Sequence, residues 1–364
     1  MGQSLIFCFD GTDNEPNDAR PEKEWFGLFG SKDNGVSNIF KLHLFFGGDL
    51  HNNPAANGQH SFYYSGVGTY GSWLRQKLNA ALAPEKMDVR TILNRAGEDL
   101  QKHYQSGDRI YVFGFSRGAA LARRFACLLH KYVPSIGEND QVVRFLGVID
   151  TVASIGVPNL EDDQKPRTQV VFENMTVSAH VQEAIHLLSI DETRVAFQPT
   201  LMNHEERVTE VWFPGAHSDV GGGFAKRGLS DSSLRFLIDQ MHLRDIGLTI
   251  LEPEDVQLDK IVLAGGKYVL TAEDIAIRPD HLDTMHVKRR IWPYSKLTLN
   301  TRSVRVNVAD QRSTLVPLIF HIMVDRAKQD GTYRPTAMHE VTHLLLADDG
   351  TTVEYSGMAD HLLP

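Results

Sequence analysis

Cysteine is almost missing from this sequence, whose 364 residues contain only Cys8 and Cys127. Each lies in an apolar run, and neither is part of a Cys-x-x-Cys pair, so we expect both to be buried as small hydrophobic side chains. A cysteine-based zinc site needs such pairs. We therefore expect no metal and no cofactor.

Positive charge is also in short supply. The chain has 37 Lys and Arg against 46 Asp and Glu, which gives a formal net charge of −9, and no run is rich in Lys or Arg. Nucleic-acid binding depends on basic surface, so no nucleic-acid partner is expected. The charge favours a neutral or zwitterionic substrate over a polyanionic one.

Long apolar runs are missing too, since no segment is long and apolar enough to span a bilayer. The start, Met1-Gly2-Gln3-Ser4, enters a strand at once and lacks the basic segment and apolar core of a signal peptide. Gly2 does not complete a myristoylation signal, because position 6 is Ile6 rather than Ser or Thr. We expect a chain made in the cytoplasm as a soluble protein, and any export must use a route that does not read a classical signal.

Apolar residues make up 42% of the chain, enough for a large core. Short apolar runs alternate with segments of helical periodicity, which predicts an α/β fold with a mostly parallel sheet flanked by helices. Strands are predicted at 5–9, 61–65, 110–113, 142–149, 208–213 and 304–308. Helices are predicted at 38–46, 89–103, 119–129, 178–188, 230–241 and 315–328. We expect one domain over 1–364, with inserted lid or cap segments at 17–60 and 250–301.

The segment Gly114-Phe115-Ser116-Arg117-Gly118 lies between a predicted strand and a predicted helix. A serine on such a turn adopts a strained backbone that lifts its hydroxyl clear of the sheet, and flanking glycines avoid collisions. This pattern predicts a nucleophile elbow. In the alternative interpretation, Ser116 is only the N-cap of the following helix.

Two further residues follow predicted strands and complete a catalytic set with Ser116. Asp150 ends the apolar run 142–149, and His217 lies on a glycine-rich loop after the strand 208–213. The order Ser, Asp, His is that of α/β-hydrolases, so we expect Asp150 to orient His217 and His217 to deprotonate Ser116. Asp150 could instead be an ordinary turn residue, and His321 is a rival base inside a predicted helix.

The turn after the first predicted strand, Asp10-Gly11-Thr12, is expected to face the same crevice as Ser116. The N–H groups of Gly11, Thr12 and Arg117 are the predicted oxyanion hole. Asp10 is a candidate for substrate contact, although its side chain could simply hold the turn. This turn is also reminiscent of aspartate-nucleophile phosphatases, but the carboxylate they need two residues earlier is Cys8 here.

Two loops are candidates for contact with substrate or membrane. Gly66-Val67-Gly68-Thr69 follows the second predicted strand, and we expect the backbone at Gly66 and Gly68 to come close to substrate. The aromatic cluster 25–29 would be a membrane-docking loop if exposed, whereas packed inside it would be part of the core.

Five segments together resemble one family: the type VI secretion lipase effectors of the first Tle class, which contain an uncharacterised α/β-hydrolase domain. The segments are Phe9-Asp10-Gly11-Thr12-Asp13-Asn14, Gly66-Val67-Gly68-Thr69, Gly114-Phe115-Ser116-Arg117-Gly118, Gly147-Val148-Ile149-Asp150-Thr151-Val152 and the run from Val211 to Gly223. By motif position, the resemblance implies Ser116 as nucleophile, Asp150 as acid and His217 as base. It also implies an α/β-hydrolase fold and hydrolysis of acyl esters of membrane glycerophospholipids.

We therefore expect a serine esterase or lipase of the phospholipase A type, acting as an antibacterial effector exported by a type VI system. Its expected partners are a lipid or acyl-ester substrate, a membrane in transient contact, and a secretion-machinery or immunity protein. Two alternatives stay open: a carboxylesterase or thioesterase acting on soluble substrates, and a non-catalytic binding module. The complete Ser, Asp and His set argues against the second alternative.

Overall fold

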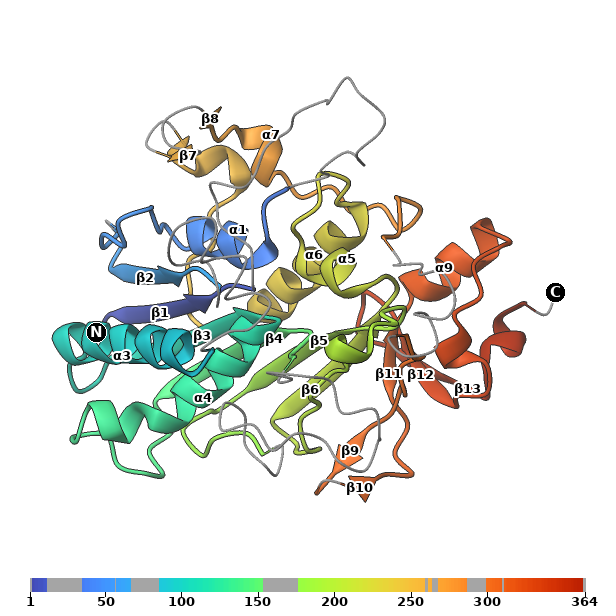
Figure 1. The fold of residues 1–364 in the computed structure, drawn as a ribbon, viewed down its shortest axis with the longest axis horizontal. Coiled ribbons are helices and arrows are strands. Elements are labelled where there is room, and N and C mark those ends of the chain that lie inside the picture. Colours follow the sequence, from blue (N-terminus) through green and yellow to red (C-terminus); the bar gives the residue numbers. More distant parts are fainter. Residues whose placement is uncertain are drawn as a thin grey trace.

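Figure 1 shows the fold of the chain as a computed structural model. The structure describes residues 2–11, 35–55, 57–66, 85–152, 176–258, 261–263, 268–286, 299–309 and 311–362. The aromatic cluster 25–29 lies outside these residues.

Among the described residues, nine strands form one sheet in the order β13-β12-β11-β6-β5-β4-β3-β1-β2. All neighbouring pairs from β2 to β12 are parallel, and β13 pairs antiparallel with β12. The strands are β1 Ser4–Phe9, β2 Gln59–Tyr64, β3 Arg109–Phe115, β4 Val143–Ile149, β5 Ala184–Ser189, β6 Val208–Phe213, β11 Leu318–Phe320, β12 His343–Leu346 and β13 Thr352–Tyr355. The predicted α/β fold with a mostly parallel sheet is confirmed.

The side chains of β1 alternate between the two faces of the sheet, as the period of a strand requires. Leu5, Phe7 and Phe9 belong to one buried cluster, together with residues of α3 and α4. Ile6 and Cys8 belong to a second cluster, together with residues of α1 and α6. Both faces are therefore covered by helices, which explains why the strand reads as a continuous apolar run.

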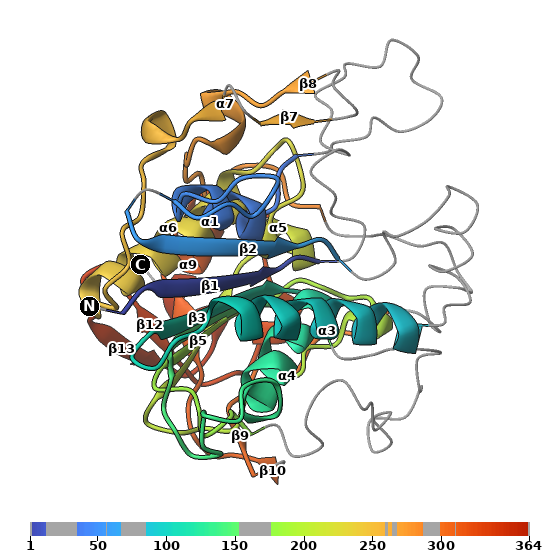
Figure 2. The same cartoon turned by 90° about the vertical axis from the view of Figure 1, so that its left-hand side faces the viewer.

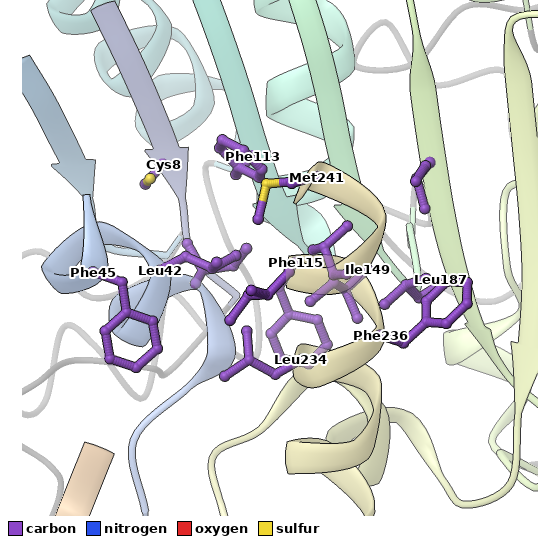
Figure 3. Close-up of a cluster of buried hydrophobic side chains, with 14 of the residues drawn as sticks. Cys8, Leu42, Phe45, Phe113, Phe115, Ile149, Leu187, Leu234, Phe236 and Met241 are labelled. Atoms are coloured by element: carbon purple, nitrogen blue, oxygen red, sulfur yellow. The ribbon is translucent and has the colours of Figure 1, made fainter. Parts of the chain in front are cut away.

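Helices cover the two faces as Figure 2 shows, with α1 and α6 on one side and α3 and α4 on the other. Figure 3 shows α1 and α6 packing on the strands, with Phe45 and Leu234 among the labelled side chains. The α-helices are α1 Asn38–Phe45, α3 Glu85–His103, α4 Arg117–Tyr132, α5 His217–Gly221, α6 Gly228–Leu243, α7 Ala272–Ile275 and α9 Ile322–Gln329. The smaller elements are η2 Val195–Phe197, η3 Pro253–Asp255, η6 Thr336–Met338, η7 Met358–Leu362, β7 Val262–Leu263, β8 Tyr268–Val269, β9 Asn307–Val308 and β10 Gln311–Arg312.

The parallel strands bring the predicted site residues to one edge of the sheet. In the register of β3 and β4, Phe115 pairs with Ile149, and these residues directly precede Ser116 and Asp150. Parallel strands end at the same edge, so the turns after β1, β3, β4 and β6 all lie there.

The helix predicted at 178–188 is wrong. This segment holds the strand β5, Ala184–Ser189, which is fully buried between β4 and β6. A central parallel strand is apolar on both faces, so its residues show no alternation that could distinguish it from a buried helix.

The prediction for the last third of the chain is also corrected. The segment predicted as a single helix at 315–328 contains the strand β11 followed by α9. Only Asn307–Val308 of the strand predicted at 304–308 is paired, as β9 with β10. Residues 343–355, for which no strand is predicted, supply β12 and β13 to the main sheet.

The two expected insertions contain different kinds of structure. Between 17 and 60, the described residues include α1, which is buried throughout, and the start of β2. Between 250 and 301, they include η3, the β7–β8 pair and α7. The single domain with lid or cap insertions stays a prediction.

One buried ion pair joins α1 to α6. The ammonium group of Lys41 lies 2.6 Å from the carboxylate of Asp231, and both side chains are 0% exposed. Burial lowers the pKa of Lys41, whereas Asp231 counteracts this effect. Removing Lys41 would leave the buried Asp231 carboxylate with only the more distant Arg227 guanidinium, whose Nε lies 3.2 Å from Oδ2, as a cationic partner among the described residues.

We predict that Lys41→Met lowers the free energy of unfolding by about 3 kcal/mol, because Asp231 keeps its charge but loses its closest cation. Urea unfolding followed by circular dichroism measures the change. Lys131→Met, at an exposed position of α4, is the matched control and should have little effect. Equal unfolding midpoints for the two variants would contradict the prediction.

Candidate active site

Ser116 lies on the turn between β3 and α4 with φ of 58° and ψ of −125°. Such a backbone costs a non-glycine residue about 1–3 kcal/mol. A Cβ atom on Gly118 would lie 2.3 Å from the carbonyl oxygens of Phe9 and Asp10, and one on Gly114 would lie 2.7 Å from the Gly118 carbonyl. The strand, sharp turn and helix predicted here are confirmed, and both glycines are required sterically.

Ser116 occupies the N-cap position of α4, but its side chain makes no capping hydrogen bond. The alternative in which the serine serves only as a cap therefore has no support. The Ser116 N–H donates to the carbonyl of Ile149 at 3.0 Å, and its carbonyl accepts from the N–H of Val152 at 3.2 Å. These bonds join the turn to the end of β4, where Asp150 lies.

Asp150 and His217 are in direct contact. Nδ1 of His217 lies 2.5 Å from Oδ2 of Asp150, although 67 residues separate them. The His217 side chain is 4% exposed and the Asp150 side chain is 0% exposed. Asp150 has a positive φ of 42°, a backbone conformation that costs a non-glycine residue energy and that clusters at functional sites. The contact predicted between acid and base is present.

His217 lies at the start of the short helix α5 rather than on the predicted loop, and two aromatic rings flank it. It is the first residue of α5, and Asp219 accepts a hydrogen bond from the N–H of the N-cap residue, Ala216, at 2.9 Å. The rings of Phe115 and Phe197 lie 4.6 and 4.9 Å from the imidazole, measured between centroids. The orientation of the ring is therefore fixed by packing as well as by Asp150.

Arg302 is a site residue that sequence reasoning missed. Its Nη1 donates to Oδ1 of Asp150 at 2.6 Å and its Nη2 donates to Oδ2 at 2.9 Å, with both side chains 0% exposed. Ser189 also donates to Asp150, through its N–H at 3.1 Å and its hydroxyl at 3.3 Å. A lone arginine in a segment without a recognisable motif gives no signal that points to this contact.

These contacts set the acidity of the pair. Burial alone would raise the pKa of Asp150, but the Arg302 guanidinium and the His217 imidazole hold that pKa well below its ordinary range. Burial lowers the pKa of His217, and Asp150 partly restores it. Near neutral pH the site therefore holds an ionised carboxylate beside a neutral imidazole, the resting state of a general base.

The turn after β1 is organised by the Asp10 carboxylate, which is 1% exposed. Its Oδ2 accepts from the hydroxyls of Ser37 at 2.5 Å and Tyr63 at 2.6 Å, and its Oδ1 accepts from the Gly11 N–H at 2.6 Å. The Asp10 side chain thus holds the turn, as one of the two interpretations expects. An oxyanion at Gly11 would have to compete with this carboxylate.

The other predicted backbone sites are only partly described. Arg117 opens α4 directly after Ser116, at the helix N-terminus, where an N–H can face an anion. Gly66 is buried just after β2. Thr12 and Gly68 lie outside the described residues. Contact of Asp10, Gly66 and Gly68 with substrate stays a prediction.

His321, the rival base, faces different carboxylates. Its Nδ1 lies 2.6 Å from Asp325 and its Nε2 lies 3.0 Å from Asp348. It is the N-cap residue of α9, so the prediction that placed it inside a helix is wrong. The Asp150 carboxylate contacts His217, which favours His217 as the base.

Two features are absent from the described residues: a metal-ligand cluster and a membrane-spanning helix. No group of three or more His, Cys, Asp or Glu side chains there could hold a metal ion. Within the same residues, no helix has the length and apolar character needed to cross a bilayer.

A known protein family matches most of the chain. The family described as "T6SS, Phospholipase effector Tle1-like, catalytic domain" matches residues 3–133 and 134–240, which is more than half of the chain. The matched residues contain Ser116, Asp150 and His217, whereas Arg302 lies beyond them.

Similar individual proteins are more distant. The uncharacterized protein YEL023C of Saccharomyces cerevisiae is 25% identical over 248 residues, which cover 54% of this chain and 32% of the yeast protein. An uncharacterized protein from Pseudomonas aeruginosa, known from a crystal structure, has a TM-score of 0.44 and 18% identity over 77% of this chain and 49% of that one. The Tle1 effector bound to the VgrG spike from the type 6 secretion system has a TM-score of 0.39 and 24% identity, over 62% and 51%. The chain thus spans about a third of the yeast protein and about half of each solved chain.

We predict that Gly118→Ala disrupts the turn at Ser116, because the added Cβ meets the backbone of β1 at 2.3 Å, where nothing flexible can move aside. The free energy of unfolding should fall by about 2 kcal/mol. Displacement of the serine should lower kcat for a soluble ester roughly 10²-fold. Urea unfolding and ester hydrolysis measure the two effects.

Gly331→Ala is the matched control, since a Cβ at Gly331 meets nothing within 4 Å. It should retain wild-type stability and activity. A Gly118→Ala variant indistinguishable from Gly331→Ala would show that the turn does not need glycine.

Proposed function

Because the chain belongs to the family of Tle1-like catalytic domains of type VI secretion phospholipase effectors, we propose that it is a serine hydrolase. Its proposed substrates are the acyl esters of glycerophospholipids. The observation that carries this proposal is the buried 2.5 Å contact between Asp150 and His217. It lies at the same edge of the sheet as Ser116, whose strained turn suits a nucleophile.

The proposed mechanism begins with proton transfer from Ser116. Since Nδ1 of His217 donates to Asp150, the neutral imidazole has its lone pair on Nε2, the atom that would accept the Ser116 proton. The serine oxygen then attacks the acyl carbonyl, and the imidazolium returns its proton to the leaving alcohol. Water attacks the acyl-enzyme in the same way and releases the fatty acid.

The tetrahedral intermediate carries an oxyanion, for which the N–H of Arg117 is the first proposed donor. It follows the nucleophile and belongs to the first turn of α4. The turn Asp10-Gly11-Thr12 is the second proposed source of a donor, because the backbone of its first residue, Asp10, lies beside Gly118, two residues after the nucleophile. Each such donor is worth about 3 kcal/mol in the transition state.

The substrate class rests on the family. A Ser, His and Asp set performs acyl transfer, so we propose cleavage at a carboxylic ester of the lipid, the phospholipase A type of reaction. As a type VI effector, the protein would be exported by that system, contact its machinery and an immunity protein, and bind the target membrane transiently. We also propose that residues 1–364 form a single hydrolase domain.

We predict that Ser116→Ala and His217→Ala each lower kcat by roughly 10⁴-fold or more, because each removes one member of a set that acts as a unit. Release of fatty acid from phosphatidylcholine and phosphatidylethanolamine vesicles is the assay. A fluorophosphonate probe should label wild-type Ser116 and leave Ser116→Ala unlabelled.

The matched control is His321→Ala, which removes the other candidate base and should keep wild-type kcat. Wild-type activity in His217→Ala would disprove the assignment of the base. If the protein hydrolyses soluble p-nitrophenyl esters but releases no fatty acid from vesicles, it is an esterase for soluble substrates, and the proposed phospholipase activity is wrong. Failure of the probe to label native protein would exclude a serine enzyme.

The pKa of His217 predicts the pH profile. Burial lowers this pKa below its ordinary value of 6.5, and the base must be neutral to act. Activity should therefore persist as the pH falls to 6.5 and be lost only below it. The acid-side midpoint of kcat/KM reports this titration, and a midpoint above pH 6.5 would contradict the prediction.

A second titrating group, Asp191, contacts the backbone two residues before His217 and therefore requires a control. Burial raises the pKa of Asp191 to about 6, and its carboxylate accepts from the N–H of Gly215 at 2.7 Å. Asp191→Asn retains an acceptor at this position without the charge. The acid limb is the fall of kcat/KM at low pH. If the acid limb of Asp191→Asn has the same midpoint as that of wild type, it reports the titration of His217.

A further inference from the structure

Arg302 reaches the site from a segment that lies beyond residues 3–240, the part matched by the family. Two backbone contacts hold this segment to the loop after β5. Leu299 forms a bridge with Arg194, and the N–H of Asn300 donates to the carbonyl of Thr193 at 2.6 Å. The guanidinium is thereby placed beside Asp150, the acid of the predicted triad.

The Arg302 guanidinium forms a bidentate pair with Asp150, in which Nη1 donates to Oδ1 at 2.6 Å and Nη2 donates to Oδ2 at 2.9 Å. Nη1 also donates to the carbonyl and hydroxyl of Ser189, at 2.8 and 2.7 Å. A planar fork bound in this way fixes the plane of the carboxylate as well as its place. Arg302 therefore holds the carboxylate in the orientation that presents Oδ2 to His217.

Arg302 also contacts Phe197, whose ring flanks the imidazole of His217. Its Nη2 donates to the carbonyl of Phe197, whose ring stands edge-on at 4.9 Å from the ring of His217. One side chain thus ties together the acid and one of the two aromatic rings that flank the base.

We propose that Arg302 is a positioning residue for the hydrolysis proposed above, which orients Asp150 toward His217 and neutralises the buried acid–base pair. The inference rests on the proposed function of Ser116, Asp150 and His217. It assigns a role to a residue outside the matched family segment.

The charges around the imidazole give this role a measurable signature. His217 is faced by Asp150 and Arg302, and by Glu192, which accepts its backbone N–H at 3.3 Å and is itself paired with Arg194. Burial lowers the pKa of His217, Asp150 raises it, and Arg302 lowers it. Loss of the Arg302 charge should therefore raise the pKa of His217 and move the acid limb of kcat/KM to higher pH.

A purely structural role would give a different result. If Arg302 only fastened the segment 299–309 to the loop after β5, its replacement would lower stability without moving the acid limb. The experiment therefore compares Arg302→Met, which loses charge and fork, with Arg302→Lys, which keeps the charge and loses the bidentate fork.

We expect Arg302→Met to lower kcat by roughly 10²-fold, less than the ~10⁴-fold effect of disabling a triad acid. Its acid limb should move to higher pH. Arg302→Lys should show a smaller loss of kcat with the acid limb close to that of wild type. Arg123→Met is the matched control, because Arg123 is 3% exposed and also donates to two backbone carbonyls. It should lower stability and leave the acid limb in place.

Urea unfolding shows which variants are folded, and Arg302→Lys keeps the test informative if Arg302→Met does not fold. Wild-type kcat in folded Arg302→Met, or an unshifted acid limb in that variant, overturns the proposal. So does a shift in Arg302→Lys as large as that in Arg302→Met.

A readout independent of turnover separates this proposal from the proposed function. Nuclear magnetic resonance titration of the His217 imidazole should show a higher pKa in Arg302→Met than in wild type, and little change in Arg302→Lys. If wild-type protein hydrolyses no ester, the proposed function fails. The titration still decides whether Arg302 controls the Asp150–His217 pair.

Discussion

The buried carboxylate of Asp150 is the point on which the site depends. An ionised group without exposure is costly unless donors surround it, and here Arg302, His217 and Ser189 all donate to it. Without Arg302 and Ser189 the protonated acid would be favoured, and it would be a poorer acceptor for the hydrogen bond from Nδ1 of His217. Three distant parts of the chain, the end of β4, the start of α5 and the segment at 302, are thereby held in one geometry.

Backbone strain at two positions accompanies this arrangement. Ser116 and Asp150 are non-glycine residues with φ of 58° and 42°, and strained residues of this kind persist only when their surroundings over-determine them. The pairing of β3 with β4 supplies that constraint, since the Ser116 N–H donates to the last carbonyl of β4 at 3.0 Å. Folding of the sheet therefore positions both residues before any substrate binds.

Sequence patterns predicted the central strands well, because each apolar run was short and ended in a turn residue. They failed at β5, where burial on both faces removed the alternation that marks a strand. They also failed at β11, which is only three residues long and joins α9 almost directly. Both errors arose where the identity of an element depended on its neighbours in the sheet rather than on its own residues.

The sequence by itself determined the turn at Ser116, through glycines that only a tight elbow requires, and the order in which Ser116, Asp150 and His217 follow their strands. These features are local, because they depend on residues a few positions apart. Tertiary structure decided that Asp150 meets Arg302, 152 residues away, and that the Asp10 carboxylate is engaged by Ser37 and Tyr63. A buried charge takes as partners whichever groups the fold brings within hydrogen-bonding distance, and no local pattern encodes that choice.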